Sequence, residues 1–214
     1  MIDDPLATND EQLRADIDAL AERYGSGARA SEIAAARGEF DERRGRVFDD
    51  DELFTLHMSL FLEWYCLERS LSGSGRTPVL DRLASGADLD AESHARHLRL
   101  ACSQRGLFEV TRSDAERETV VVHDLVRGAM FRLEGVVGVE AGEVFEGRVM
   151  PDAGRVILGP VVLFHPREAR ERIAALVTAA PPAQRESLEI VDRIAEMRLR
   201  YGRFRNIAVH HIYA

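Results

Sequence analysis

The hydrophobic pattern of this 214-residue chain changes period at Gly106 and again at Pro166. Before Gly106 apolar residues recur every three or four positions, which predicts amphipathic helices. Between the two positions, short β-branched segments separated by turn residues predict an antiparallel meander of about five strands. After Pro166 the helical period returns. Because helices and strands do not alternate, the sequence predicts an α+β fold. We expect a helical region over residues 1–105, an antiparallel β region over 106–165, and C-terminal helices over 166–214 that pack on the rest.

Apolar spacing and cap residues give the expected element bounds. Helices are predicted over residues 9–24, 30–44, 49–69, 78–84, 90–104 and 166–179, with a last one after the Pro181–Pro182 break to about Tyr201. Strands are predicted over residues 107–111, 119–124, 129–133, 144–150 and 155–164. Thr77 before Pro78 is the preferred order for an N-cap and first helical residue. Asp90 is expected to cap the next helix.

The third predicted helix is apolar on most of its surface and has only a narrow polar stripe. Such a helix has to be covered on most sides, so we expect it at the centre of the helical part, with Trp64 making its largest packing contribution. The acidic run 49–52 is expected to cap its start. Its most apolar stretch, residues 53–65, is interrupted by Thr55, His57, Ser59 and Glu63 and is too short to cross a bilayer, and the N-terminus lacks a secretory signal pattern. We therefore expect a cytoplasmic protein with no membrane partner.

Composition excludes several kinds of chemistry. All 28 basic residues are arginines, so Walker A loops, Schiff-base lysines and lysine general bases are absent. The net charge of −9 is uneven: it is −9 over residues 1–69, −3 over 70–164 and +3 over 165–214. The acidic total argues against broad polyanion binding, and the opposite ends are expected to attract each other or two different partners. Cys66 and Cys102 are interpreted as small buried hydrophobes.

Several motifs suggest a ligand but have a simpler structural explanation. The loop GSGRT, residues 73–77, has glycines and an arginine suited to phosphate, yet it follows a helix and reads better as a linker and cap. The acidic run lacks the pattern of a calcium loop. Histidine pairs at His94 with His97 and His210 with His211 have no third ligand at metal spacing. We therefore assign no catalytic, cofactor-binding or metal-ligating residue, and expect no cofactor.

The arginine-rich segment, residues 197–206 (MRLRYGRFRN), interleaves arginines with aromatic residues. This chemistry serves stacking on nucleic-acid bases, and it is also enriched at protein interfaces. A third explanation is a helix end whose arginines complement the helix dipole and pair with the acidic N-terminal region. The residues predicted to bind a partner are Arg198, Arg200, Tyr201, Arg203, Phe204 and Arg205.

The sequence also resembles a loosely defined group of cytosolic bacterial proteins. The resemblance rests on an F-x-x-W-[FY] box at Phe61, Trp64 and Tyr65 and on a G-R-T-P turn at residues 75–78, leading into a small β domain. It covers about residues 30–165 and implies a fold more than an activity. Some relatives carry a Cys-rich SEC-C type zinc tail, which this chain lacks, so the resemblance implies no zinc here.

These observations favour a non-enzymatic cytosolic protein that acts as an adaptor or regulator by binding other proteins. One alternative is a nucleic-acid-associated regulator that uses the arginine-rich segment. Another is an enzyme of unknown class with a site at the sheet edge, where His123 and His165 end predicted strands. The second alternative requires those two histidines to converge with carboxylates in a closed pocket.

Overall fold

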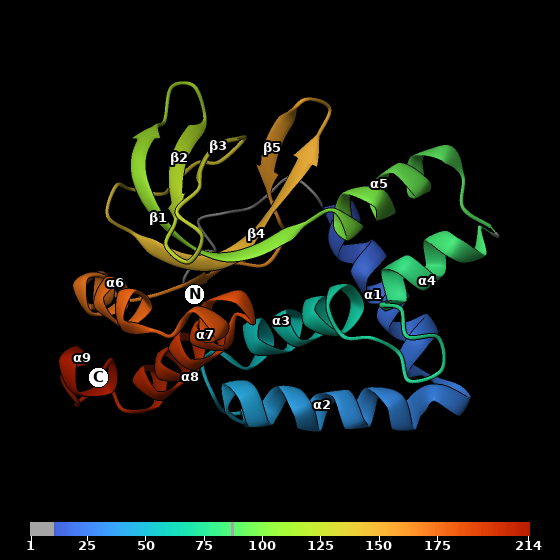
Figure 1. The fold of residues 1–214 in the computed structure, drawn as a ribbon, viewed down its shortest axis with the longest axis horizontal. Coiled ribbons are helices and arrows are strands. Elements are labelled where there is room, and N and C mark those ends of the chain that lie inside the picture. The colour runs from blue at the N-terminus through green and yellow to red at the C-terminus, as the bar shows by residue number, and fades with distance from the viewer. Residues whose placement is uncertain (1–10, 87) are drawn as a thin grey trace.

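The structure is a computed structural model that describes residues 11–86 and 88–214. Helices at both ends of the described chain flank a six-stranded sheet (Figure 1), which confirms the predicted α+β class. The helices are α1 (Glu11–Gly25), α2 (Ala30–Arg44), α3 (Phe54–Leu67), α4 (Pro78–Ser85), α5 (Ala91–Ala101), α6 (Arg170–Ala179), α7 (Pro182–Glu186), α8 (Glu189–Arg203) and α9 (Val209–Ile212). The strands are β1 (Gln104–Asp114), β2 (Thr119–Asp124), β3 (Met130–Glu134), β4 (Val144–Asp152), β5 (Arg155–Leu158) and β6 (Leu163–Phe164).

The N-terminal helices bury the faces that their spacing predicts. In α1 the buried apolar stripe is Leu13, Ile17, Leu20 and Tyr24. The expected start of this helix, at residues 9 and 10, lies outside the described residues. The central position of α3 is confirmed, since it packs against α1, α2 and α4. The buried Trp64 ring lies 5.5 Å from the Phe40 ring of α2, and such aromatic pairs add about 0.5–1.5 kcal/mol beyond the area that they bury.

Both predicted side-chain caps are present. The Thr77 hydroxyl oxygen accepts a hydrogen bond from the backbone N–H of Leu80 at 3.4 Å, and Pro78 is the first residue of α4. The Asp90 carboxylate accepts one from the backbone N–H of Ser93 at 2.7 Å and opens α5. These bonds satisfy amide groups that the first helical turn leaves without partners.

The predicted start of the third helix is wrong. The acidic run 49–52 forms a turn, and α3 begins only at Phe54. The Asp51 carboxylate accepts a hydrogen bond from the backbone N–H of Phe48 at 2.8 Å, so it stabilises the turn before the helix and does not cap α3. The same carboxylate also binds an arginine from the C-terminal part, described below.

The strands close into a small barrel. Hydrogen bonding runs in the order β1-β2-β3-β5-β4, and β4 pairs back with β1, while β6 extends the sheet from β4. All pairs are antiparallel except β3 with β5, which are parallel at Leu133 and Val156. That pair closes the barrel, whereas the predicted simple meander would leave two open edges. The interior is filled by apolar side chains including Phe108, Val110, Val120, Val122, Leu133, Phe145, Val149 and Leu158.

The strand predicted over residues 155–164 is divided into two. Pro160 has no backbone N–H to donate to a ladder, and β5 ends before it. The two pieces pair with different parts of β4: Ile157 lies opposite Met150, and Leu163 lies opposite Glu146. The break therefore gives the sheet six strands where about five were expected.

The C-terminal part contains more helices than the two predicted. The last predicted helix is divided into α7 and α8 at Leu188, whose φ of +60° places it in the left-handed region that non-glycine residues seldom adopt. The Leu188 side chain is buried in the hydrophobic cluster formed by the C-terminal helices, which holds the residue in this conformation. A short further helix, α9, follows α8 and returns Ile212 and Tyr213 to the same cluster.

Hydrophobic contacts join the three expected regions. Met150 and Leu163 of the barrel belong to the cluster of the N-terminal helices. Leu107 and Val144, on the outer face of β1 and β4, belong to the cluster of α6 and α8. Figure 1 shows these helices lying beneath the barrel. Among residues 11–86 and 88–214, no helix combines the length and the apolar character that a bilayer span needs.

Candidate functional site

The arginine-rich segment ends α8 and continues into the following turn, and only part of it faces solvent. Arg198 turns inward, where its Nε donates a hydrogen bond to the carbonyl oxygen of Phe164 at 2.8 Å and burial lowers its pKa. Tyr201 is half-buried against the C-terminal hydrophobic cluster. Arg200 and Phe204 lie one helical turn apart and are both exposed. The structure therefore separates the predicted partner-binding residues into inward and outward groups.

Two further arginines of this segment bind the acidic run. Arg203 Nε donates a hydrogen bond to Asp51 Oδ1 at 2.8 Å, and hydrogen bonding to Arg203 lowers the pKa of Asp51. Arg205 pairs with Glu52. The acidic and basic ends of the chain thus attract each other, as the charge distribution predicts. Within the described residues, no three metal-ligating side chains lie close enough together to hold an ion.

Exposed residues of two segments come together at the contact between Arg203 and Asp51: Arg46 and Phe48 contact Arg203, and Arg200, Phe204 and Ile207 are near Arg203 in the chain. We name this patch the arginine–aromatic surface, and its residues are Arg46, Phe48, Arg200, Arg203, Phe204 and Ile207. Phe48 is 53% exposed and Phe204 is 48% exposed. The guanidinium groups of Arg46 and Arg203 lie 5.5 and 5.3 Å from the centre of the Phe48 ring. Neither Arg46 nor Arg200 pairs with a carboxylate in the described part of the chain.

A buried charge cluster lies where the helices meet the barrel. Its members are Arg44 of α2, Glu63 of α3, Glu68 just after α3, Arg105 of β1, Glu146 and Arg148 of β4, and Asp192 of α8. Glu146, which is fully buried, accepts hydrogen bonds from Arg44 at 2.8 Å and from Arg105 at 3.3 Å. Arg105 also donates to Asp192 at 2.8 Å. These pairs offset the high cost of removing each charge from water.

The remaining members of the cluster carry an excess negative charge. Arg148 Nε lies 3.2 Å from Glu63 Oε2 and also pairs with Glu68. Burial raises the pKa of Glu63 to about 7, against the opposing effect of Arg148. The seven members are four carboxylates and three arginines, so a proton on Glu63 makes their charges equal; Arg43, outside the cluster and 42% exposed, also lies 4.0 Å from Asp192. For Glu68 burial acts to raise the pKa, but Arg105 and Arg148 outweigh it and hold the pKa below its usual value.

Sequence reasoning missed this cluster because no local spacing marks it. Arg44 and Glu146 are 102 positions apart, and Arg105 and Asp192 are 87 apart. The one local sign of a buried charge is Glu63 within the apolar third helix. It belongs to the narrow polar stripe of that helix, which predicts an exposed position for it. The pairing of the charged groups joins α2, α3 and α8 to the barrel, while Arg44 Nε, Glu63 Oε1, Arg105 Nε and Asp192 Oδ2 stay buried without a hydrogen-bond partner in the described residues.

The two histidines expected at the sheet edge do not converge. Glu109 of β1 lies opposite His123 on β2 and opposite Val144 on β4, and the His165 backbone N–H bonds to the Val144 carbonyl. Three strand spacings, about 14 Å, therefore separate the two histidines along one row of the sheet. His165 is buried with its Nδ1 3.1 Å from the Tyr213 hydroxyl, and burial lowers its pKa to about 3. The arrangement offers no shared site for acid and base groups.

The other residues weighed as ligands have structural surroundings. Gly75, with a φ of +67°, forms the turn before α4, and the following Thr77 caps that helix. His97 lies 2.8 Å from the Ser93 carbonyl oxygen, whereas His94 is exposed. The GSGRT loop therefore acts as a linker and cap, and the i, i+3 histidine pair points in two directions.

The two cysteines differ. Cys66 is buried in α3, as predicted, and burial raises the pKa of its thiol. Cys102 is exposed, so its predicted burial is wrong. It follows α5 at the junction with β1, outside the apolar stripe on which Leu100 is buried.

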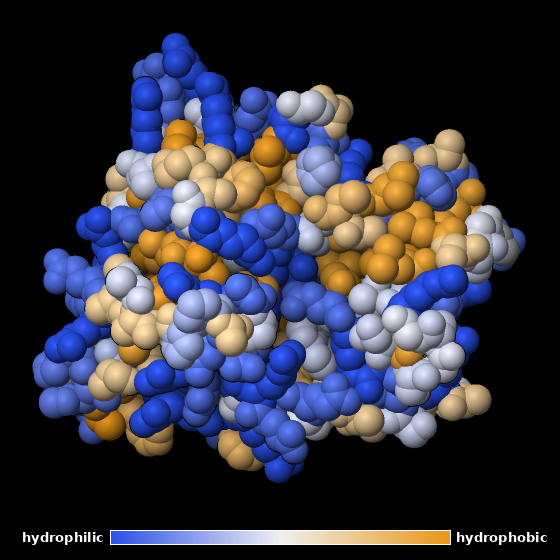
Figure 2. Space-filling model, viewed as in Figure 1, coloured by the Kyte–Doolittle hydropathy of each residue, from blue (hydrophilic) through white to orange (hydrophobic). Residues whose placement is uncertain are grey.

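The surface of residues 11–86 and 88–214 has depressions in the helical part and on the barrel. One of about 250 Å³ lies between α1, α4 and α5, where Figure 2 shows hydrophobic side chains gathered. Its polar groups are already used in part, since Asp16 binds Arg96 at 2.6 Å. Another, of about 70 Å³, lies on the outer face of the barrel over β1, β2 and β3.

Known proteins give no further guide to these sites. The F-x-x-W-[FY] box is buried in α3 and the G-R-T-P turn precedes α4, which are packing and turn positions. No protein family, curated protein or solved structure matches this chain, so its function has to be inferred from its own geometry.

Proposed function

We propose that this is a non-enzymatic cytosolic protein that binds another protein through the arginine–aromatic surface. The observation that supports this most is the exposure of Phe48 and Phe204 beside arginines without carboxylate partners. Aromatic residues and arginine are enriched at protein interfaces and supply most of their binding hot spots. Burying two half-exposed phenylalanine rings on a partner would be favourable.

The charges of the surface indicate the chemistry of the partner. Arg203 is already bound to Asp51, but Arg46 and Arg200 remain available for carboxylates of another chain. The exposed rings of Phe48 and Phe204 supply the apolar part of the contact. A protein segment with acidic residues beside apolar side chains fits both features, with complementary charge adding to the rate of association.

The competing nucleic-acid function has weaker support. Arg203 and Arg205 are paired within the chain, so few arginines of the segment remain for phosphates. The enzyme alternative is also weak, because three strand spacings separate His123 on β2 from His165, which directly follows β6. If an RNA or DNA strand bound with micromolar affinity at physiological salt and binding were lost in a variant with Arg200, Arg203 and Arg205 changed to Ala, the nucleic-acid function would replace the one proposed.

Quantitative affinity capture with crosslinking tests the proposal. The bait is the full chain, compared with a Phe48→Ala, Phe204→Ala double variant. Leu98→Ala is a matched control, because Leu98 is 45% exposed on α5, away from the surface. We expect the parent and the control to capture at least one common partner. The captured amount should fall about tenfold or more in the double variant and should decrease when salt is added. Identical capture by all three baits would contradict the proposal.

A further inference from the structure

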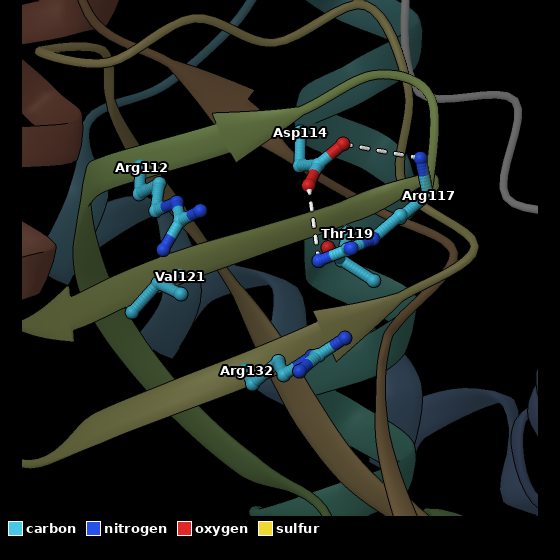
Figure 3. A pocket seen from close by; sticks show the side chains of 6 residues that line it. All are labelled: Arg112, Asp114, Arg117, Thr119, Val121 and Arg132. Atoms are coloured by element: carbon cyan, nitrogen blue, oxygen red, sulfur yellow. Dashed lines mark hydrogen bonds and ion pairs between the residues drawn. The ribbon is translucent and has the colours of Figure 1, made fainter.

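The small depression on the barrel is lined by Arg112 and Asp114 of β1, Arg117 of the following turn, Thr119 and Val121 of β2, and Arg132 of β3. Figure 3 shows the three arginine side chains along one face of these strands, around Val121 and Thr119. The face lies far from the arginine–aromatic surface, since Figure 1 shows the β1–β2 hairpin and the helices α2 and α8 at opposite ends of the molecule. It therefore has to be interpreted separately.

A β-bulge in β1 creates this arrangement. Val110 points into the barrel, and regular alternation would send Arg112, two positions later, in the same direction. The register shifts between these two residues, so Arg112 lies opposite Val121 on the outer face. The Thr111 hydroxyl donates a hydrogen bond to the Val121 carbonyl oxygen at 3.0 Å and fixes the bulge. Bulges are frequently used to redirect a side chain at a functional site.

The bulge completes a row of cationic side chains. Val121 lies opposite Arg112 on one side and opposite Arg132 on the other, so the two arginines flank it about 10 Å apart at their Cα atoms. Neither guanidinium makes an ion pair or hydrogen bond with any residue in 11–86 or 88–214. The Thr119 hydroxyl, in the next row of the same face, is also without a partner there.

The one carboxylate that lines the depression is already in use. Asp114 Oδ1 accepts a hydrogen bond from the backbone N–H of Arg117 at 3.2 Å, and Oδ2 lies 3.8 Å from the Arg117 guanidinium. Three arginines thus face one carboxylate, in a protein whose net charge is −9. The excess of arginine is confined to the lining of the depression, since Glu134, Glu116 and Glu118 lie around it, and this lining suits a small anion.

We propose that this depression binds the phosphate group of a phosphate monoester. Arg112 and Arg132 would donate hydrogen bonds to the phosphate oxygens from either side of Val121, and the Thr119 hydroxyl would donate one from the neighbouring position on β2. Planar guanidinium groups suit the paired oxygens of phosphate. A volume of about 70 Å³ accommodates one such group, whereas a whole drug-sized ligand needs roughly 300–1,000 Å³. The rest of the ligand would lie outside the depression.

A single phosphate fits this face better than a nucleic-acid strand. Glu116 and Glu118 lie in the adjoining turn, and Glu134 lies opposite Thr119 at the rim. These carboxylates would repel an extended polyanion more than a single phosphate group held between Arg112 and Arg132. Phosphate monoesters can come from a phosphorylated side chain or from a small molecule, and both have the same chemistry at this site.

Titration of the isotope-labelled full chain, followed by NMR, tests the proposal. The probes are inorganic phosphate, a phosphoserine-containing peptide and a single-stranded oligonucleotide. We expect saturable shifts of the backbone amides of Arg112, Val121 and Arg132 with phosphate, with a dissociation constant in the millimolar range or tighter. Arg132→Gln and Arg112→Gln should each weaken binding about tenfold or more. Arg172→Gln, an exposed arginine on α6 with the same change in net charge, should have no effect.

The titrations distinguish a phosphorylated protein chain from a small phosphate as the ligand, and both from a nucleic-acid strand. A peptide that binds about tenfold tighter than inorganic phosphate supports a phosphorylated chain as ligand, and equal affinities support a small phosphate. Absent saturation, or equal weakening by Arg172→Gln, would overturn the proposal. So would an oligonucleotide that binds this face more tightly than the monoesters. The Phe48→Ala, Phe204→Ala variant should titrate like the parent, so this proposal and the proposed function fail independently.

Discussion

Arginine occupies two contrasting environments in this protein. In the buried charge cluster, Arg44 and Arg105 each lie 2.8 Å from a carboxylate oxygen. On the barrel face, Arg112 and Arg132 have no carboxylate partner in residues 11–86 and 88–214. Both pairs come from regular elements, and Arg105 and Arg112 even belong to the same strand.

The difference follows from solvation. An unpaired charge in the interior would cost several kcal/mol, so the buried arginines of the cluster, Arg44, Arg105 and Arg148, are each matched by an acid within the fold. An exposed guanidinium remains hydrated and needs no partner for stability. Paired interior arginines are therefore structural, and unpaired arginines gathered on one face are available for a ligand. Four predictions test this comparison.

The largest effect is expected at the centre of the buried charge cluster. Glu146→Gln removes the carboxylate that Arg44 and Arg105 share; Arg105 keeps Asp192 at 2.8 Å, but the nearest carboxylate left to the buried Arg44 is Asp192 at 3.8 Å. We expect the free energy of unfolding to fall by about 3–5 kcal/mol, measured by chemical denaturation. The control is Glu116→Gln in the exposed β1–β2 turn, which should change it by less than about 0.5 kcal/mol. Equal small effects would show that the cluster does not stabilise the fold.

The second prediction concerns the proton on Glu63. Its pKa in the folded protein, about 7, is raised above the ordinary value of 4.5, so the folded state holds this proton more tightly than the unfolded chain. The resulting stability is fully present below pH 4.5 and is lost as the pH rises to about 7. Glu63→Gln does not titrate, so its stability relative to the parent should rise by about 3 kcal/mol across this window. Denaturation at several pH values measures this, and a difference independent of pH would mean that Glu63 is ionised throughout.

A smaller effect is expected where an arginine is paired near the surface. The Arg203 side chain is 27% exposed beside Asp51. A double-mutant cycle with Arg203→Gln and Asp51→Asn should give a coupling free energy of about 0.5–1 kcal/mol. It should decrease at high salt, because exposed charges are screened. A coupling free energy as large as the loss of about 3–5 kcal/mol expected for Glu146→Gln would contradict the proposed contrast between buried and exposed pairs.

The smallest effect is expected on the barrel face. Arg112→Gln and Arg132→Gln remove charges that have no partner in the described protein, so each should change the free energy of unfolding by less than about 0.5 kcal/mol. The same denaturation measurement checks this. Destabilisation by more than 1 kcal/mol would reveal a structural role for these residues and weaken the case for a ligand site.

Local features of the sequence were sufficient for most elements. The stripe of α1, the caps at Thr77 and Asp90, and the turn residues between strands each act over a few positions. They predict helices and strands close to those observed, because helix capping and side-chain periodicity depend on neighbours in the chain. The start of α3 failed for the same reason, since Asp51 is bound by Arg203, about 150 positions away.

The candidate sites were less predictable. Alternation places Arg112 inside the barrel unless the bulge at Thr111 is known, and a bulge depends on how two strands pair. The arginine-rich segment was visible in the sequence, but which of its side chains turn inward was not.

The sequence by itself determined the α+β class, the order of the helical and β regions, the apolar stripe of α1 and the excess of acid at one end of the chain. Only the tertiary structure decided which carboxylate meets which arginine, that β3 runs beside β5 to close the barrel, and that Arg112 faces outward. The physical reason is range. Periodicity and capping act between near neighbours, whereas charge pairing and barrel closure join residues up to about 150 positions apart, whose proximity no local pattern encodes.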